Sequence, residues 1–185
     1  EHIENIKISE IVDFPNHPFK VIVDDEMREM SKSIEEHGVL VPVLVRPKQD
    51  GKFEMISGHR RKKASELANI NTIPCIIRDL TDDEATIIMV DSNMQREHIL
   101  PSEKAFAYKL KLEALNHQGK RTDLTLSPMD TKLDSAEKIG KEFDDSRATV
   151  FRYIRLTELI PEILEMVDNE RIAFRPAVEI SYLTK

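Results

Sequence analysis

The sequence has no tryptophan, one cysteine and only five glycines among its 185 residues. A single cysteine excludes a disulfide framework and any zinc site built from cysteines, and it favours a reducing cytoplasm. The low glycine content, with nine prolines, excludes a collagen-like or low-complexity chain. No apolar run approaches the roughly 18–20 residues that a membrane-spanning helix needs, so we expect no membrane partner.

Charged residues make up 33% of the chain and hydrophobic residues 40%, which is typical of a globular protein. The net charge of −7 excludes a uniformly basic coat for nucleic acid, but DNA binding needs only one basic face. The length suits one moderate domain or two small ones. Because the sequence begins with Glu1 instead of methionine and stops at Lys185, we expect it to be part of a longer protein.

The first eighty residues contain short β-like runs separated by helical ones, which predicts an α+β domain. Asp50-Gly51 lies between two of these runs and is typical of a hairpin turn. The predicted strands lie at 6–8, 42–47, 52–56 and 73–77.

Two helices are predicted between these strands. The first covers 25–37, begins after the capping residue Asp24 and ends at Gly38. Its apolar stripe is expected to consist of Met27, Met30 and Ile34. The second helix follows Gly58, and the residues predicted on its inner face are Ala64, Leu67 and Ala68.

The pattern becomes helical in the second half of the chain. A Thr-Asp-Asp-Glu capping box at 81–84 predicts the start of one helix, and another is predicted over 101–117. Residues 119–134 have no clear period and contain Pro128, so we expect a loop or linker there. Everything after that segment is predicted to be helical again.

Residues 135–156 have the pattern of a helix-turn-helix. The predicted inner residues are Ala136, Ile139, Phe143, Val150 and Ile154, and either Asp145 or Ser146 is expected to cap the second helix. The outward residues of that helix include three arginines and no acidic residue, in a chain that is acidic overall. Short polar residues and arginine near a helix N-terminus suit base edges and phosphates. The predicted DNA-contacting residues are Ser146, Arg147, Thr149, Arg152, Tyr153 and Arg155. An ordinary helical hairpin with a solvated basic face would give the same pattern.

A second segment suits phosphate. Gly58 joins a strand to a helix and is followed by Arg60 and Arg61. Backbone N–H groups at a helix N-terminus and adjacent arginines bind anions such as a polyphosphate. Taken alone, a tight turn with two solvated arginines explains the segment equally well, and the polar cluster at 91–97 could be a helix end with its loop.

Together, these segments resemble the ParB-type partition family. The run Gly58-His59-Arg60-Arg61-Lys62-Lys63-Ala64 is similar to the Gly-x-Arg-Arg-x-x-Ala box of that family. Residues 92–105 are similar to its second box, Glu-Asn-x-Gln-Arg-x-x-Leu-x-Pro-x-Glu-x-Ala. Residues 33–45 resemble the family's opening helix–Gly–strand segment, and 135–180 resemble its helix-turn-helix and the helices behind it. The resemblance covers nearly the whole chain in order, except the longer 119–134 segment.

This resemblance implies an α+β fold with a small mixed-sheet, ParB/sulfiredoxin-like nucleotide-binding domain at 1–98 and an all-α helix-turn-helix domain at 99–185. It implies a dimeric clamp that binds CTP with Mg²⁺ and closes over double-stranded DNA at a centromere-like site during chromosome or plasmid segregation. The implied partners are a second copy, bound through the N-domain and a C-terminal domain outside this sequence, and a partition ATPase. The expected location is the cytoplasm, on the nucleoid or a plasmid.

By position, the resemblance assigns the triphosphate to Gly58, His59, Arg60 and Arg61, and it places Ser92, Asn93, Arg96 and Glu97 in the rest of the pocket, with Asn93 as the metal ligand. His59 and Ser92 stand where the family usually has glutamate. A serine hydroxyl brings no charge to Mg²⁺, and the side chain of the adjacent Asp91 points about 100° away on a helix. We therefore expect a weak CTPase at most, with nucleotide binding retained.

Three alternatives remain beside the clamp. A sulfiredoxin-like redox enzyme needs a cysteine after Gly58, but this chain has His59 there and its only thiol, Cys75, lies in an apolar strand. A nuclease needs clustered carboxylates, whereas the acidic runs at 24–26 and 82–84 are explained by helix capping. The third alternative is a non-enzymatic, site-specific DNA-binding regulator without nucleotide switching. Ser92 favours that regulator, while the retained arginines favour the clamp.

Overall fold

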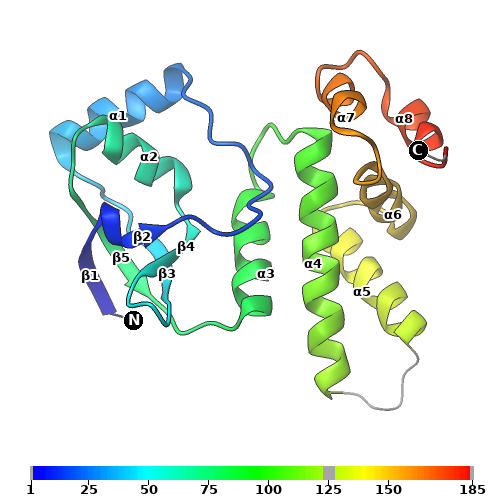
Figure 1. The fold of residues 1–185 in the computed structure, drawn as a ribbon, viewed down its shortest axis with the longest axis horizontal. Coiled ribbons are helices and arrows are strands. Elements are labelled where there is room, and N and C mark those ends of the chain that lie inside the picture. Colours follow the sequence, from blue (N-terminus) through cyan, green and yellow to red (C-terminus); the bar gives the residue numbers. More distant parts are fainter. Residues whose placement is uncertain (1, 123–127, 184–185) are drawn as a thin grey trace. The chain divides into compact units, whose positions relative to one another are not determined.

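The computed structural model describes residues 2–122 and 128–183, and these form two compact units (Figure 1). The first unit ends at Thr81 and the second begins at Asp82. The expected fold class is confirmed, because a small mixed α+β unit is followed by a helical one. The predicted domain boundary after residue 98 stays a prediction.

The first unit contains a mixed sheet of five strands. Their order across the sheet is β1 (His2–Lys7), β5 (Thr72–Ile77), β3 (Val43–Pro47), β4 (Phe53–Ser57) and β2 (Ile11–Val12). The β1–β5 and β3–β4 pairs are antiparallel, and the β5–β3 and β4–β2 pairs are parallel. Strands are confirmed at all four predicted segments, although β1 ends at Lys7 and the predicted strand residue Ile8 lies outside it. The two-residue β2 is too short to show an alternation and was not predicted. A short 3₁₀ helix, η1 (Ile8–Glu10), precedes it.

The predicted hairpin turn between β3 and β4 is confirmed. Gly51 has a φ of +79°, which favours glycine, and its N–H donates to the Lys48 carbonyl at 3.1 Å. The core of the unit is formed by residues of β1, β3, β4 and β5. Its centre consists of the buried residues Ile6, Val43, Val45, Met55, Ile73 and Cys75.

Two helices pack against each other in this unit, α1 (Asp25–His37) and α2 (His59–Leu67). The predicted limits of α1 are confirmed: Asp24 Oδ1 accepts from the Met27 N–H at 2.8 Å, and Gly38 follows the last turn with a φ of +73°. Met27 and Ile34 of α1 are buried against Ala64 of α2, as expected.

The predicted inner face of α2 is partly wrong, because Leu67 is 44% exposed. The buried residues of α2 are His59, Lys62, Ala64 and Ser65. Three of these four are polar, so the buried stripe of this helix does not follow its apolar residues. A search for apolar periodicity therefore selects the wrong face of the helix.

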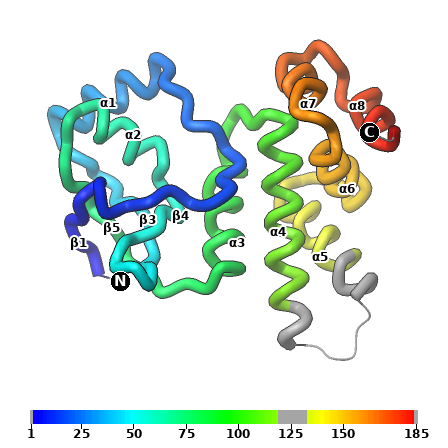
Figure 2. Tube along the Cα trace, viewed as in Figure 1, coloured from blue at the N-terminus to red at the C-terminus, as the bar shows by residue number. Residues whose placement is uncertain are grey.

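The second unit consists of helices in its described part. These are α3 (Asp82–Asn93), α4 (Pro101–Thr122), α5 (Pro128–Glu142), α6 (Arg147–Leu156), α7 (Pro161–Asp168) and α8 (Phe174–Ile180). The long α4 is central, because α3, α5, α6 and α7 all pack against it (Figure 2). The α4–α5–α6 core contains the buried residues Tyr108, Leu112, Ala136, Ile139 and Val150.

The expected loop at 119–134 is wrong for most of its length. Helix α4 continues through Gly119 to Thr122, and α5 already begins at Pro128. Glycine inside a helix costs only about 1 kcal/mol, and proline is well suited to a first helical turn because its missing N–H would have no partner there. Neither residue therefore ends a helix at this place, and residues 123–127 lie outside the described part.

Candidate nucleotide and DNA sites

The predicted phosphate segment begins at Gly58, whose backbone no other residue type would adopt easily. Its φ is +110°, and a Cβ atom at this position would lie 2.5 Å from Val43 Cγ1 and 2.9 Å from Val43 Cβ. Glycine is therefore required both by conformation and by the close approach of β3. The segment turns directly from β4 into α2, whose first N–H groups have no partner within the helix.

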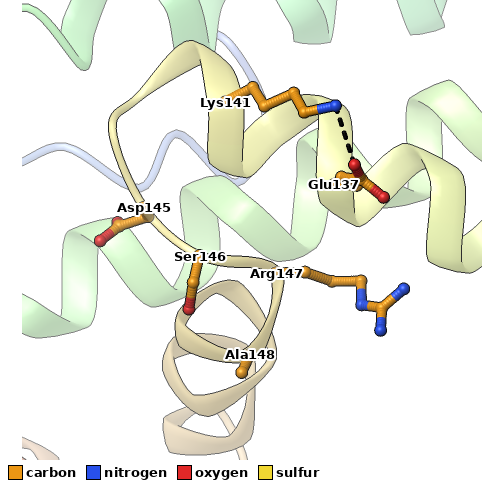
Figure 3. Close-up of a pocket in the computed structure, with 6 residues that line it drawn as sticks. All are labelled: Glu137, Lys141, Asp145, Ser146, Arg147 and Ala148. Carbon is orange, nitrogen blue, oxygen red and sulfur yellow. Dashed lines mark ion pairs between the residues drawn. The ribbon is translucent and has the colours of Figure 1, made fainter.

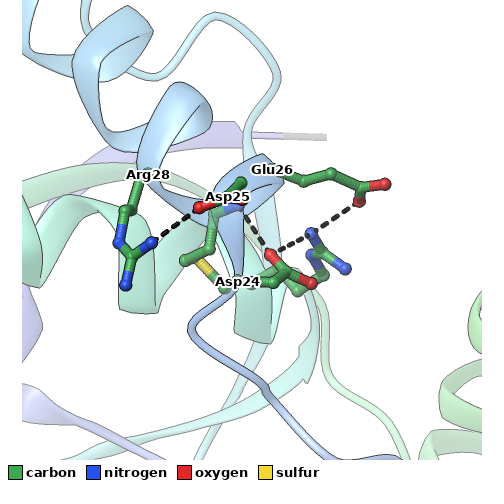
Figure 4. Close-up of polar contacts among 6 residues, drawn as sticks. Asp24, Asp25, Glu26 and Arg28 are labelled. Atoms are coloured by element: carbon green, nitrogen blue, oxygen red, sulfur yellow. Dashed lines mark hydrogen bonds and ion pairs between the residues drawn. The ribbon is translucent and has the colours of Figure 1, made fainter.

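The two arginines of this segment already have partners within the first unit. Arg60 Nη2 lies 3.0 Å from Glu26 Oε2 and 3.5 Å from Asp24 Oδ1. Figure 4 shows these two carboxylates at the start of α1, beside the Asp25–Arg28 pair. A phosphate at α2 would therefore compete with two carboxylates for Arg60.

Arg61 is turned toward the backbone that leads into β3. Its Nη1 donates to the carbonyls of Val41 at 2.6 Å and Pro42 at 2.7 Å. Burial lowers the pKa of the Arg61 guanidinium from its usual value, although arginine keeps its charge in proteins. Arg61 thus fixes the loop before β3 to the N-terminus of α2.

His59 lies inside the first unit. It is 7% exposed, and its ring centroid is 3.9 Å from that of His17. Next to it, the Lys62 ammonium donates to Asp13 Oδ1 at 2.7 Å and to the Ile11 carbonyl at 3.0 Å. His59, Lys62 and Asp13 border a small pocket of about 130 Å³ that Val21, Lys63 and Glu66 also line.

The charged groups around Asp13 lower the pKa of its carboxyl. Burial alone would raise its pKa, but the hydrogen bond and charge of Lys62, helped by His59 and His17, hold the pKa below its ordinary value. Asp13 therefore remains a carboxylate paired with Lys62 at neutral pH.

The other predicted nucleotide residues belong to the second unit, at the end of α3. Ser92 Oγ and Asn93 Nδ2 both donate to the Met89 carbonyl, at 3.1 Å and 2.8 Å. The buried Asn93 thus keeps its amide oxygen as an acceptor, which is the atom that a hard cation would use. The turn after α3 carries Arg96 and Glu97, and Glu97 is exposed.

Two observations bear on the enzymatic alternatives. Burial raises the pKa of the Cys75 thiol to about 11, so this cysteine is not an activated nucleophile. Among the side chains that the structure describes, those of 2–118 and 133–183, no three histidine, cysteine or acidic groups come together as a metal site. The raised pKa of Cys75 argues against the redox enzyme.

The predicted helix-turn-helix is formed by α5 and α6. Ser146 is the capping residue, because its Oγ accepts from the Thr149 N–H at 3.1 Å. Arg147 and Arg152 are exposed as expected. A pocket of about 440 Å³ lies at this turn and is lined by the residues drawn in Figure 3, which are Glu137, Lys141, Asp145, Ser146, Arg147 and Ala148.

Two of the residues predicted to point outward from α6 do not. The Tyr153 ring packs against Tyr108, with centroids 5.8 Å apart, and against Phe174 at 4.5 Å. Arg155 Nη2 donates to the Ser181 carbonyl after α8, and its guanidinium lies over the Tyr182 ring. These outward positions were wrong because the helical pattern does not show that α8 covers this side of α6.

The sequence patterns missed Gly140 and Lys111. A Cβ on Gly140 would lie 2.5 Å from the Asp145 carbonyl, so glycine lets the turn pack on α5. Lys111 of α4 is 2% exposed and is held by Asp91 of α3 and Glu142 of α5, the latter at 2.6 Å. Burial raises the Asp91 pKa although Lys111 opposes this. A glycine in the interior of the amphipathic helix α5 was the available signal for Gly140, and the sequence contains no comparable signal for Lys111.

The sequence model of the ParB N-terminal domain matches residues 1–94. The chain belongs to the ParB N-terminal domain family. Among curated relatives, it is 35% identical over 158 residues to the chromosome-partitioning protein Spo0J of Thermus thermophilus, covering 85% of this chain and 52% of the relative. It is 32% identical over 177 residues to a nucleoid occlusion protein of a Geobacillus species, covering 96% of this chain and 57% of that relative. The chain thus spans about half the length of these relatives.

Solved ParB structures have a similar fold. The C-terminally truncated ParB of Caulobacter crescentus, complexed to the centromeric parS site, matches with a TM-score of 0.58 and 24% identity, covering 98% of this chain and 86% of that one. A Pnob8-like ParB-N domain matches with a TM-score of 0.63 and 14% identity, covering 97% of this chain and 78% of that one.

Within the described residues, no helix is both long and apolar enough to cross a membrane.

Proposed function

We propose that this chain is the site-specific DNA-binding part of a partition protein, which acts in chromosome or plasmid segregation as a CTP-dependent dimeric clamp. The observation that carries the DNA-binding part is the α5–α6 helix-turn-helix, with a Ser146-capped α6 and two exposed arginines. The names of the chromosome-partitioning relatives, and the parS complex formed by the Caulobacter protein, support the same assignment.

Helix α6 has the size and chemistry of a reading helix. Its ten residues span about 15 Å, and the major groove of B-DNA is about 12 Å wide. Arg147 lies in the first turn, where side chains reach base edges. Arg152 lies five residues further, about 140° around the helix, which suits a phosphate on the groove wall.

Alanine substitutions of these arginines test the DNA assignment. If Arg147 contacts a base, Arg147→Ala lowers affinity about 5- to 150-fold and relaxes specificity at one base pair. Arg152→Ala is expected to weaken binding to all sequences and to reduce the salt dependence. Arg28→Ala removes an exposed arginine from α1 and serves as the control. Unchanged affinity in both α6 variants would refute α6 as the reading helix.

For the nucleotide, we propose that the N-terminus of α2 receives the CTP phosphates, with Gly58, His59 and Arg61 shaping the segment and Arg60 supplying charge. Arg60 must leave Glu26 to do so. Mg²⁺ would neutralise phosphate charge and would be held by phosphate oxygens and the Asn93 amide oxygen. Ser92, Arg96 and Glu97 complete the proposed set, and the uncharged Ser92 leaves at most weak hydrolysis.

Equilibrium binding of CTP, ATP, GTP and UTP, with and without Mg²⁺, tests this assignment. CTP is expected to bind selectively and to lose affinity in Arg60→Ala. Glu26→Gln is the matched opposite, because it removes a competitor for Arg60 and should strengthen binding. Binding that both substitutions leave unchanged would refute the role of Arg60.

The second candidate is a DNA-binding regulator without nucleotide switching. It is favoured by the internal partners of Arg60 and Arg61 and by Ser92, which bonds to its own helix. Site-specific crosslinking between two copies separates the candidates. The clamp predicts that CTP changes the crosslinking of the N-terminal units, whereas the regulator predicts no change. A partition ATPase and a second copy of the chain remain the proposed partners.

A further inference from the structure

Asp145, the last turn residue before the α6 cap, is tied to both other helices of the helix-turn-helix core. Its backbone N–H donates to the Gly140 carbonyl of α5 at 2.8 Å. Its Oδ2 accepts from the Tyr108 hydroxyl at 2.6 Å and lies 2.7 Å from Lys104 Nζ. Tyr108 and Lys104 both belong to α4. The start of α6 is therefore fixed by its main chain to one helix and by a side chain to another.

These contacts lie in a shielded environment. Tyr108 is fully buried, and the side chains of Asp145 and Lys104 are only 18% and 21% exposed. Charge-assisted hydrogen bonds in such surroundings are stronger than neutral, solvated ones. Burial and the neighbouring carboxylate of Asp145 raise the pKa of Tyr108, so its hydroxyl stays a donor at neutral pH.

Lys104 also contacts α6 itself. Its Nζ lies 4.8 Å from the centre of the Tyr153 ring and 5.5 Å from that of Tyr108. Both distances are within the range of cation–π attraction. Lys104 thus connects Asp145, which precedes the α6 cap, with Tyr153 in the second turn of α6.

The carboxylate of Asp145 stands two residues before Arg147, at the end of α6 that would face DNA. Figure 3 shows the two side chains pointing away from one another. An unpaired carboxylate at this position would repel phosphate, and the ammonium of Lys104 cancels its charge.

We propose that Lys104 and Tyr108 are positioning residues for DNA recognition: they hold Asp145 so that the first turn of α6 keeps one orientation, and Lys104 neutralises the carboxylate beside the DNA-reading residues. This inference rests on the proposed DNA-binding function. Neither side chain needs to touch DNA.

The test begins with selection of a preferred duplex from a random library by the unaltered chain. Affinities for that duplex and a scrambled duplex are then measured for each variant over a range of salt concentrations, with thermal unfolding followed in parallel. Tyr108→Phe removes one hydroxyl and keeps the ring. Lys104→Met removes a charge next to Asp145. Lys109→Met is the control, because it removes a charge from α4 at a residue that pairs with Glu158 instead, at 4.0 Å.

Tyr108→Phe is expected to reduce discrimination between the two duplexes about tenfold, with little loss of affinity for the scrambled one. Lys104→Met is expected to weaken binding to both duplexes more than Lys109→Met does. Adding Asp145→Asn to Lys104→Met should restore most of the lost affinity.

Equal losses of affinity in the two lysine variants, or no rescue by Asp145→Asn, would overturn the charge role. Unchanged discrimination in Tyr108→Phe would overturn the positioning role. If Tyr108→Phe does not fold, discrimination by Lys104→Met decides in its place. Failure of the unaltered chain to select any sequence would refute the proposed function itself.

Discussion

Replacing Gly58 with alanine adds a methyl group where β3 leaves no space and where the backbone disfavours a side chain. The φ of +110° costs a non-glycine residue about 1–2 kcal/mol. The contact of 2.5 Å with Val43 Cγ1 adds an overpacking term of about 1–3 kcal/mol, because the fully buried Val43 cannot move aside freely. We therefore expect Gly58→Ala to lower the free energy of unfolding of the first unit by about 2–5 kcal/mol.

Gly51→Ala separates the two terms. Gly51 also has a positive φ, of +79°, but a Cβ there would meet nothing within 4 Å. Only the conformational cost of about 1–2 kcal/mol is expected in this variant. The difference between the two variants is thus the cost of the contact with Val43.

The single cysteine provides an assay that reports only the first unit. Cys75 is fully buried in its sheet, so a short pulse of thiol reagent across a urea gradient labels only molecules in which this unit is open. With an m value of about 1 kcal/mol per molar urea for a unit of this size, Gly58→Ala should lower the midpoint by about 2 M or more. Equal midpoints for Gly58→Ala and Gly51→Ala would refute the reasoning from the contact.

Two further predictions concern titratable groups. At pH 8, the pKa of about 11 leaves Cys75 about a hundredfold less thiolate than an exposed thiol with a pKa of 9.0 would have. Thiol reagents should therefore modify the native chain far more slowly than the chain in urea. Stoichiometric labelling of the native chain within seconds would contradict this. Asp13→Asn should lower stability by less than about 1 kcal/mol at pH 7, because the Asp13 side chain is 70% exposed and screened. Since the pKa of Asp13 is lowered below 3.8, this difference should be present above about pH 4 and disappear as the pH falls through the lowered pKa. Urea midpoints at pH 7 and pH 3 measure it, and an equal difference at both would contradict the assigned cause.

The sequence was sufficient where local chemistry determines structure. The Asp24 cap, the Asp50-Gly51 turn and the Ser146 cap each depend on residues within a few positions of one another. The strands of the first unit and the apolar residues of the helix-turn-helix also show their periodicity directly. Pattern analysis fails where one local signal has two outcomes: proline favours loops, but it also suits the first turn of a helix, and Pro128 begins α5.

The sequence pattern does not predict contacts between residues that are far apart in the chain. On an isolated α6 helix, Tyr153 and Arg155 would point toward solvent. In the folded unit, Tyr153 contacts α4 and α8, and Arg155 contacts the residues that follow α8. The pairing of Arg60 with Glu26 joins residues 34 positions apart. An ion pair of this kind decides whether an arginine is available to a ligand. Which residues form it depends on the topology of the fold more than on the spacing of residues in the sequence.

The most direct test of the central claim is the affinity of this chain for the duplex that it enriches most from a random library, compared with a scrambled duplex of the same length and composition. Fluorescence anisotropy at several salt concentrations separates the sequence-specific part of binding from the electrostatic part. The account predicts at least about tenfold tighter binding to one preferred sequence, a preference that persists as salt rises. Equal affinity for both duplexes at every salt concentration, together with no sequence enriched from a random library, would contradict it.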